Sequence, residues 1–231
     1  MKYKNIVKGT FLSRPNRFIA HVLIDGVETT VHVKNTGRCR ELLQPRAEVY
    51  LERSDNPARK TQYDLVAVKK GRRLVNMDSQ IPNAAAYEWI SSGAFKRNVT
   101  TLRREVTFGN SRFDIYLEYK DDDGTARKAF VEVKGVTLED NDVVRFPDAP
   151  TERGIKHIHE LVECLKEGYE AYLLFVVQMK DVKYFEPDRV IHGDFADALK
   201  EAHDRGVQVL AYDCEVTSCS MEIRDPVEVR L

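Results

Sequence analysis

The sequence contains a hairpin pattern that would place two acidic side chains opposite each other. Between residues 112 and 134, two runs alternate apolar and polar residues with the period of two that strands have. Residues 121–125, Asp-Asp-Asp-Gly-Thr, separate the runs and are typical of a turn. A hairpin symmetric about residue 123 places Asp114 opposite Glu132, with Cβ atoms about 5 Å apart. One divalent cation could bridge these carboxylates.

Lys134 follows Glu132 by two residues and therefore projects from the same face. An Asp on one strand and Glu-x-Lys on the next resemble the core of the PD-(D/E)xK nucleases. The competing interpretation is a solvated hairpin face, because Glu-x-Lys triplets also arise by chance. Two similar triplets, at residues 118–120 and 181–183, lack an acidic partner on a preceding strand.

These residues define a predicted site for Mg²⁺ or Mn²⁺. The expected metal ligands are Asp114, Glu132, the carbonyl of Val133, and Glu88 from a preceding helix. Glu88 could equally be a solvent-facing residue of an amphipathic helix. Asp114, Glu132 and Lys134 form the predicted catalytic set, which would hydrolyse a phosphodiester by in-line attack.

The net charge of −1 conceals an asymmetry between the two parts of the chain. Residues 1–83 carry 16 Lys and Arg against 8 Asp and Glu, whereas residues 84–231 carry 20 against 29. The basic part is expected to meet a polyanion, and the acidic part to hold catalytic groups. Alternatively, the two parts attract each other across their interface.

Composition indicates a folded protein of the cytoplasm. The chain has 231 residues, of which 42% are hydrophobic, enough for one large or two small cores. We find no apolar run that could span a membrane and no signal-peptide core near the N-terminus. The four cysteines form no Cys-x-x-Cys pair, which argues against a zinc site and is consistent with free thiols, although Cys214 and Cys219 could pair if oxidised. The sequence does not determine the oligomeric state and is compatible with a homodimer.

Residues 1–82 are predicted to form an OB-like, DNA-binding β-barrel. Short strands are expected at 18–24, 29–33, 48–53, 64–69 and 73–77, with a helical turn at 38–43. Tyr50, Tyr63 and His32 could stack on unpaired bases.

Residues 83–231 are predicted to form a nuclease-like mixed sheet flanked by helices, which makes the whole a two-domain α/β (α+β) protein. A helix begins at Asn83 as N-cap and ends near Gly93. Strands are expected at 103–108, in the hairpin, at 171–178 and at 207–216, the last strand. Helices are expected from Thr151 to about residue 166 and at 195–205.

Basic and polar side chains on two barrel loops, on the hairpin and the strand before it, and on the Thr151 helix are the predicted contacts to nucleic acid. Loops and helix faces are also commonly just solvated. The predicted contacts are Lys34, Asn35, Arg38, Arg40, Arg53, Arg59, Lys60, Arg104, Arg112, Arg153, Lys156 and His157.

The chain resembles the sugar fermentation stimulation protein A (SfsA) family in motifs spread along most of its length. The matching segments are 35–38 (Asn-Thr-Gly-Arg), 54–57 with 59–60, 104–106, 109–112 with Asp114, 131–134 (Val-Glu-Val-Lys), 146–149 (Phe-Pro-Asp-Ala), 151–154 with 156–157, 174–178 and 211–212. Lys34, Cys39 and Gly135 depart from the usual pattern, and none of them is a predicted catalytic residue.

The resemblance implies an OB-like domain, a PD-(D/E)xK nuclease-like domain, nonspecific DNA binding and a regulatory role in sugar (maltose) metabolism. Two functions follow. The first is a metal-dependent nuclease, and the second is a catalytically silent DNA-binding protein with a regulatory role. The chain shows no helix-turn-helix with a basic recognition helix, which argues against sequence-specific operator binding. A carbohydrate-binding module is a weaker third interpretation, suggested only by the family name.

Overall fold

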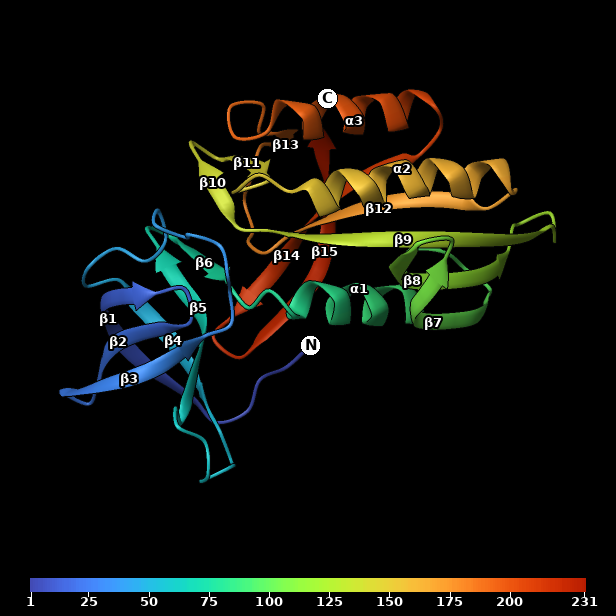
Figure 1. The fold of residues 1–231 in the computed structure, drawn as a ribbon. Coiled ribbons are helices and arrows are strands. Elements are labelled where there is room, and N and C mark those ends of the chain that lie inside the picture. The colour runs from blue at the N-terminus through green and yellow to red at the C-terminus, as the bar shows by residue number, and fades with distance from the viewer.

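The computed structural model describes residues 1–231 as a small barrel followed by a large sheet with helices on both faces (Figure 1). The barrel lies at the lower left of Figure 1, and the large sheet extends from it to the right. This arrangement confirms the predicted two-domain α/β (α+β) architecture. None of the helices has the length and apolar character needed to cross a membrane.

The first sheet closes into an OB-type barrel. Its order is β3-β2-β1-β4-β5-β6, and a parallel pairing between β3 and β5 joins its ends, with β6 attached to β5. The strands are β1 (Ile6–Asn16), β2 (Ile19–Ile24), β3 (Val27–Val33), β4 (Glu48–Arg53), β5 (Tyr63–Lys70) and β6 (Arg73–Asn76). The predicted barrel is confirmed, and the expected helical turn appears as a turn in which the amides of Leu42 and Leu43 donate to the carbonyl of Cys39.

Strand β1 is absent from the sequence prediction because its alternation is interrupted. The register of its pairing with β2 shifts after Phe11 and again after Ser13. At Gly9, a Cβ atom would come within 2.5 Å of Val22 Cγ1, so a glycine is needed for the close approach of the two strands. Such irregularities let a strand bend around a barrel, and they also hide it from a test for strict periodicity.

The second sheet is mixed and has the order β10-β11-β13-β15-β14-β12-β9-β8-β7. Its strands are β7 (Val99–Phe108), β8 (Ser111–Lys120), β9 (Ala126–Val136), β10 (Leu138–Asp140), β11 (Val143–Phe146), β12 (Glu170–Val177), β13 (Tyr184–Pro187), β14 (Gln208–Thr217) and β15 (Ser220–Val229). The prediction that the strand at 207–216 is the last one is wrong, because β15 follows and lies between β13 and β14. Frequent charges and Pro226 obscure β15 in the sequence, and β10, β11 and β13 are too short to show a period.

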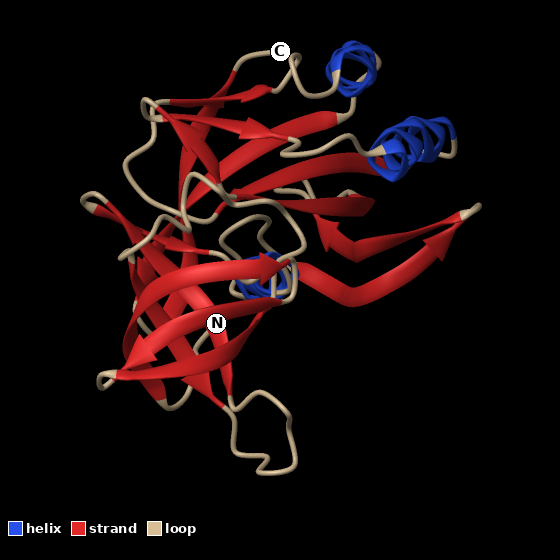
Figure 2. Ribbon diagram, turned by 60° about the vertical axis from the view of Figure 1, so that its left-hand side comes forward, coloured by secondary structure: helices blue, strands red, loops and turns tan.

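Three helices cover the two faces of this sheet. Helix α1 (Ile81–Ser91) lies on one face, and α2 (Glu152–Lys166) and α3 (Gly193–Asp204) lie side by side on the other (Figures 1 and 2). Strand β12 is buried on both faces, because Leu174 belongs to the core under α1 while Leu173 and Phe175 belong to the core under α2 and α3. This double burial explains the continuous apolar run from which the strand is predicted.

The helix termini agree only in part with the prediction. The Thr151 hydroxyl accepts a hydrogen bond of 3.1 Å from the Gly154 amide, which confirms Thr151 as the N-cap of α2. The prediction that Asn83 caps α1 is wrong, because Gln80 occupies the N-cap position, without a side-chain hydrogen bond, and Asn83 lies inside the first turn. Pro82, which favours the first helical positions, is the signal that the helix begins earlier.

Buried ion pairs join the barrel to the second domain. Glu139 of β10 is only 4% exposed, and its carboxylate contacts Lys70 Nζ at 2.6 Å and Arg73 Nη1 at 3.1 Å. Arg73 also pairs with Asp142. The basic and acidic parts of the chain therefore do attract each other across their interface. This attraction, the alternative explanation given above, accounts for part of the charge asymmetry.

The chain also crosses between the domains at its beginning. The Tyr3 amide donates to the carbonyl of Cys219, and Lys2 bridges to Ser220, so the first residues lie against the second domain. The four cysteines are free thiols, and only Cys219 is exposed. The domain boundary at residue 82 stays a prediction.

The substitution Glu139→Gln is expected to lower the free energy of unfolding by about 3 kcal/mol, because Lys70 and Arg73 lose the charge that compensates their partial burial. Urea unfolding of this variant is the measurement. Asp140→Asn, the exposed neighbour, is the matched control and should change the free energy by less than about 0.5 kcal/mol. Equal effects of the two substitutions would contradict the assigned role of Glu139.

Candidate metal and phosphodiester site

Asp114 lies in β8 where the pairing with both neighbouring strands is interrupted. The pairs of β8 with β9 run from Lys120–Ala126 to Ile115–Val131, which confirms the predicted register about residue 123. Glu105, the β7 residue beside Asp114, is skipped in the β7–β8 pairing and has a φ of 54°, a strained value for a residue other than glycine. The Asp114 carboxylate is thereby free to accept a 2.8 Å hydrogen bond from the Val133 amide.

Glu132 and Lys134 come from β9, and His157 from α2 reaches the same carboxylate. Glu132 is 2% exposed, and its Oε1 accepts a 2.5 Å hydrogen bond from Lys134 Nζ. His157 is also buried, and its Nδ1 contacts Glu132 Oε1 as well. The other oxygen of Glu132, Oε2, is buried and has no hydrogen-bond partner. A buried carboxylate oxygen without a partner is costly unless another group, such as a cation, occupies the space beside it.

The two carboxylates respond differently to the same surroundings. Burial, reinforced by the negative charge of Glu132, raises the pKa of Asp114 to about 6. Burial also acts to raise the pKa of Glu132, but the hydrogen bond from His157 and the charge and hydrogen bond of Lys134 outweigh it, and that pKa lies below its usual value. The site therefore combines a carboxyl group that exchanges its proton near pH 6, Asp114, with one whose ionised form is favoured, Glu132.

Helix α1 contributes Asn83 to this site, and Glu88 lies elsewhere. Asn83 Nδ2 donates to Asp114 Oδ1 at 2.6 Å. The Glu88 carboxylate is exposed and pairs with the N-terminal ammonium of Met1 at 2.5 Å. The expectation that Glu88 completes the metal ligands is thus corrected. Glu88 lies five positions after Asn83, which at 3.6 residues per turn places it on a different side of the helix from the residue that faces Asp114.

The remaining groups are compatible with a cation of the Mg²⁺ type. No group of three or more His, Cys, Asp or Glu side chains is placed to hold a metal ion by itself. Mg²⁺ keeps several waters and uses one or two carboxylates together with substrate phosphate oxygens, so it does not need a third acidic ligand. The unpartnered Glu132 Oε2 and the remaining lone pairs of Asp114 provide such a pair of carboxylates.

The predicted nucleic-acid contacts on α2, β7 and β8 each contact another group of the protein. Arg153 Nε lies 3.4 Å from His157 Nε2, and Lys156 Nζ donates to the carbonyl of Asn110 at 3.0 Å. Arg104 lies 4.2 Å above the ring of Tyr87, and Arg112 pairs with Glu105 at 3.5 Å. His157 was predicted to contact nucleic acid, but its burial and its contact with Glu132 place it in the carboxylate cluster instead.

The barrel residues predicted to contact nucleic acid fall into two groups. Lys34 lies within 3.8 Å of three carboxylates, Arg59 forms two hydrogen bonds to Asp64, and the buried Asn35 donates to the carbonyl of Met77. These three side chains are engaged in contacts within the protein, which the sequence alone could not reveal. The exposed residues without a carboxylate partner are Arg38, Arg40, Arg53 and Lys60.

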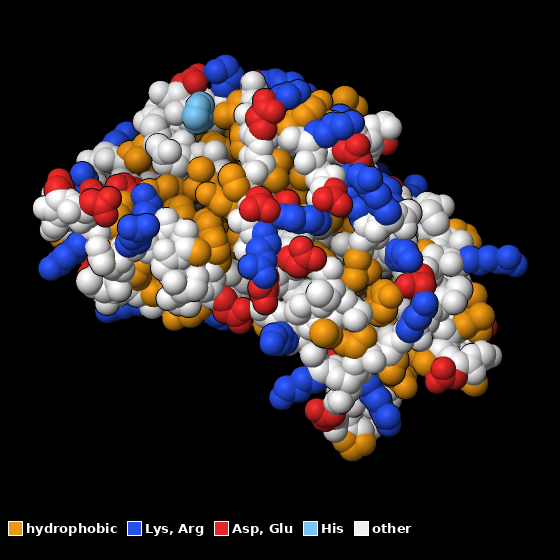
Figure 3. Space-filling view, turned by 180° about the vertical axis from the view of Figure 1, so that it is seen from behind, with side chains coloured by type: hydrophobic (Ala, Val, Ile, Leu, Met, Phe, Trp, Pro, Cys, Tyr) orange, Lys and Arg blue, Asp and Glu red, His pale blue; other side chains and the backbone are white.

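The aromatic residues expected to stack on bases are also engaged in contacts within the protein. The Tyr50 hydroxyl donates to Glu48, His32 contacts Asp64, and Tyr63 packs against the core. Seen from behind in Figure 3, Lys and Arg side chains are spread over the barrel at lower right with Asp and Glu between them, so the charge asymmetry does not produce one continuous basic face there.

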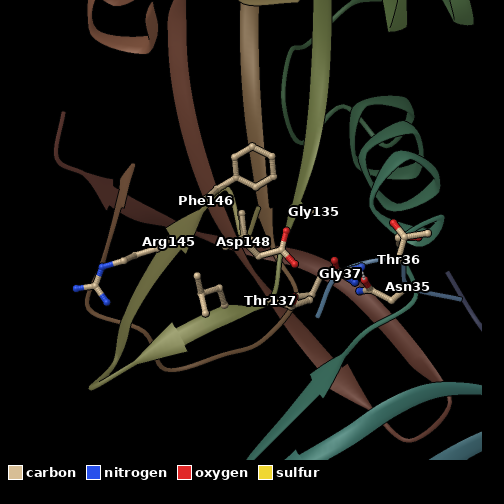
Figure 4. Close-up of a pocket in the computed structure, with 12 residues that line it drawn as sticks. Asn35, Thr36, Gly37, Gly135, Thr137, Arg145, Phe146 and Asp148 are labelled. Carbon is tan, nitrogen blue, oxygen red and sulfur yellow. Dashed lines mark hydrogen bonds between the residues drawn. The ribbon is translucent and has the colours of Figure 1, made fainter. Parts of the chain in front are cut away.

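A cavity of about 170 Å³ lies at the seam between the two domains. Asn35, Thr36 and Gly37 of the barrel face Gly135, Thr137 and Asp148 of the second domain across it (Figure 4). Gly135 directly follows Lys134, and a Cβ atom there would meet Gln178 Oε1 at 2.5 Å. We refer to this space as the seam cavity.

The fold and the site define a two-domain protein in which an OB barrel is joined to a mixed sheet that carries a buried carboxylate–lysine cluster. Family models match both parts: the SfsA N-terminal OB domain over residues 12–77 and the sugar fermentation stimulation protein RE domain over residues 80–220. The chain belongs to the sugar fermentation stimulation protein family.

Relatives match along the whole chain. The sugar fermentation stimulation protein homologs of Clostridium beijerinckii and Ruminiclostridium cellulolyticum are 54% and 55% identical over 231 residues, covering 100% of both chains in each comparison. Among solved structures, that of Pyrococcus furiosus SfsA in complex with Ca²⁺ matches with a TM-score of 0.86 and 26% identity. The match covers 100% of this chain and 98% of the Pyrococcus furiosus chain.

Proposed function

We propose that this protein binds DNA in the cytoplasm and hydrolyses phosphodiester bonds with Mg²⁺ or Mn²⁺ at Asp114, Glu132 and Lys134, in a domain of the PD-(D/E)xK type. The observation that carries the proposal is the buried, unpartnered Oε2 of Glu132 beside a second carboxylate whose pKa is raised. If Glu132 and Lys134 formed only a structural ion pair, a second buried carboxylate at Asp114 would destabilise the fold, because two like charges repel each other in a buried site. A bound cation would remove this repulsion.

The hydrogen bonds of the site suggest a separate role for the carboxylates and for the lysine. Asp114, oriented by Asn83 and the Val133 amide, and Glu132, oriented by His157 and Lys134, would hold the cation. When bound, the cation supplies polarisation of the phosphodiester and stabilisation of charge on the leaving oxygen. Lys134 is only 16% exposed and would hold the attacking water near the carboxylates by position and charge.

Metal binding by a relative supports the proposal. The Pyrococcus furiosus structure contains Ca²⁺, and it shares the fold of this chain over its whole length. Ca²⁺ and Mg²⁺ both prefer oxygen ligands, and Ca²⁺ often replaces Mg²⁺ without supporting the same chemistry. We therefore expect Ca²⁺ to bind this chain at Asp114 and Glu132.

The test is cleavage of end-labelled single-stranded, duplex and branched DNA by the full-length protein with Mg²⁺, with Mn²⁺ and with EDTA. The proposal expects products with Mg²⁺ or Mn²⁺ from at least one substrate and none with EDTA. Absence of cleavage under all conditions, with DNA binding that is insensitive to metal, would support the second candidate function instead. That candidate is a catalytically silent, nonspecific DNA-binding protein with a regulatory role in sugar (maltose) metabolism, and the occupation of Glu132 Oε1 by two donors favours it.

Lys134→Met is expected to reduce the cleavage rate by about 10²- to 10⁴-fold, because the water loses its positioning group. Stabilisation by Ca²⁺ in a thermal unfolding assay should persist, since neither carboxylate is altered. Lys120→Met, which changes the lysine of a similar triplet near the hairpin turn, is the control and should cleave like the unmodified protein. Full activity of Lys134→Met would exclude a catalytic role for this lysine.

A further inference from the structure

We propose that a groove on the barrel binds one strand of single-stranded nucleic acid and leads it toward Asp114 and Glu132. The groove has a volume of about 680 Å³, and Arg17, Arg38 and Arg40 line it together with Arg14 and Asn16. We name it the arginine groove. The inference rests on the proposed function in so far as the strand is the substrate of the carboxylate site.

The floor of the arginine groove is held together by the guanidinium of Arg14. Its two terminal nitrogens donate to four backbone carbonyls, those of Arg17, Asn35, Gly37 and Arg38, at distances between 2.6 and 2.9 Å. One cation therefore fixes the β1–β2 turn and the 34–40 loop relative to each other. This bracing fixes the backbone from which the other arginines project, which lowers the entropy lost when they bind a ligand.

The three remaining arginines carry charges that the protein does not neutralise. Arg17, Arg38 and Arg40 are exposed, and no carboxylate lies within ion-pair distance of any of them. Elsewhere on the barrel, Arg59 and Lys34 are paired with acidic residues. Three free guanidinium groups around one groove suit successive phosphates of a backbone, which they can each contact with two hydrogen bonds.

An exposed aromatic ring beside the groove favours a single strand over a duplex. Phe18 is 51% exposed and is the only aromatic residue among the exposed large hydrophobic residues. It follows Arg17 directly, its amide donates to the side chain of Asn16, and its carbonyl accepts from the Val33 amide. An exposed ring next to phosphate-binding groups is the arrangement on which unpaired bases stack, whereas the bases of a duplex are already stacked and are not accessible to it.

The arginine groove adjoins the seam cavity. Thr36 and Gly37 line both the arginine groove and the seam cavity, and the far side of the seam cavity is formed by Gly135, next to Lys134. Asp148 is the carboxylate that borders this passage, beside Gly37 (Figure 4). On this proposal, a flexible strand held by the arginines continues past the 35–37 loop into the seam between the domains and toward the carboxylates.

The test is fluorescence anisotropy with a labelled oligothymidylate of about 20 nucleotides, long enough for one OB fold, and with a duplex of equal length, both in EDTA. Phe18→Ala is expected to weaken binding of the single strand about tenfold and to leave duplex binding unchanged. Arg17→Ala, Arg38→Ala and Arg40→Ala should each weaken the single strand and reduce the slope of log K against log salt by about 0.7.

Matched controls come from the same barrel. Val27→Ala removes another exposed apolar side chain, and Arg72→Ala removes an exposed arginine outside the groove; neither should change the affinity or its salt slope. Equal losses in groove and control variants would overturn the proposal, as would a loss in Phe18→Ala that is the same for single strand and duplex.

These measurements separate the groove from the catalytic site. Binding in EDTA involves no turnover, so a protein that never cleaves DNA can still show the predicted pattern, and the groove assignment then stands while the nuclease proposal fails. Conversely, cleavage of a single strand that is unaffected by Phe18→Ala and Arg38→Ala at subsaturating substrate would contradict the groove and leave the nuclease proposal intact.

Discussion

Replacement of Glu132 by glutamine is expected to reduce metal-dependent DNA cleavage by at least about 10³-fold. The substitution preserves the size of the side chain and removes the charge that the proposed cation requires. Binding of DNA in EDTA should persist or improve, because a buried negative charge near the strand has been removed. Cleavage rates measured with saturating Mn²⁺, beside affinities measured without metal, give both quantities on the same preparation.

Glu118→Gln is the matched control for this experiment. Glu118 lies on the same hairpin and belongs to a similar Glu-x-Lys triplet, but its carboxylate contacts the hydroxyls of Tyr116 and Thr101 and stays near the surface. It should cleave at the rate of the unmodified protein. Equal cleavage by Glu132→Gln and Glu118→Gln would show that Glu132 takes no part in the reaction.

The second large effect concerns pH and follows from the raised pKa of Asp114. In the unfolded chain this carboxyl ionises near pH 4, whereas in the folded protein its pKa is about 6. As pH rises from 4 to 6, Asp114 loses its proton in the unfolded state before it does so in the folded state. The free energy of unfolding of the metal-free protein therefore falls across this interval and stays at the lower value above pH 6. Asp114→Asn should therefore raise the melting temperature in EDTA at pH 8, by the equivalent of about 1–3 kcal/mol, and change little at pH 4.

A divalent cation should reverse this loss by binding the ionised form. The rise in melting temperature with Ca²⁺ is expected to be large at pH 8, to decline as pH falls through 6, and to be absent in Asp114→Asn. Thermal unfolding in a series of buffers from pH 4 to pH 8, with EDTA or with Ca²⁺, measures both trends. A Ca²⁺ effect that is independent of pH, or that survives in Asp114→Asn, would place the cation elsewhere.

The hairpin and its register could be predicted from the sequence because their determinants are local. Strict alternation fixes which side chains share a face, and the turn at 121–125 fixes the partners, so the opposition of Asp114 and Glu132 needs no knowledge of the rest of the fold. Thr151 was likewise predictable as an N-cap from its own neighbourhood.

Other features depend on contacts between distant segments and could not be read from local pattern. Strand β1 bends through bulges, and β15 carries charges and a proline within the sheet. Lys34 and Arg59 resemble free phosphate contacts until the barrel closes and brings Asp64 beside them. Asn83 and His157 reach Asp114 and Glu132 from two helices on opposite faces of the sheet, a convergence set by helix packing that leaves no sequence motif.

The proposed activity depends on a cation held between Asp114 and Glu132. The most direct measurement is the anomalous difference map of a crystal of the full-length protein grown at pH 8 and soaked in Mn²⁺. We predict one strong peak within coordination distance of Asp114 and Glu132 Oε2, absent from crystals of Glu132→Gln. No peak between these carboxylates in a crystal that binds Mn²⁺ elsewhere would contradict the central claim.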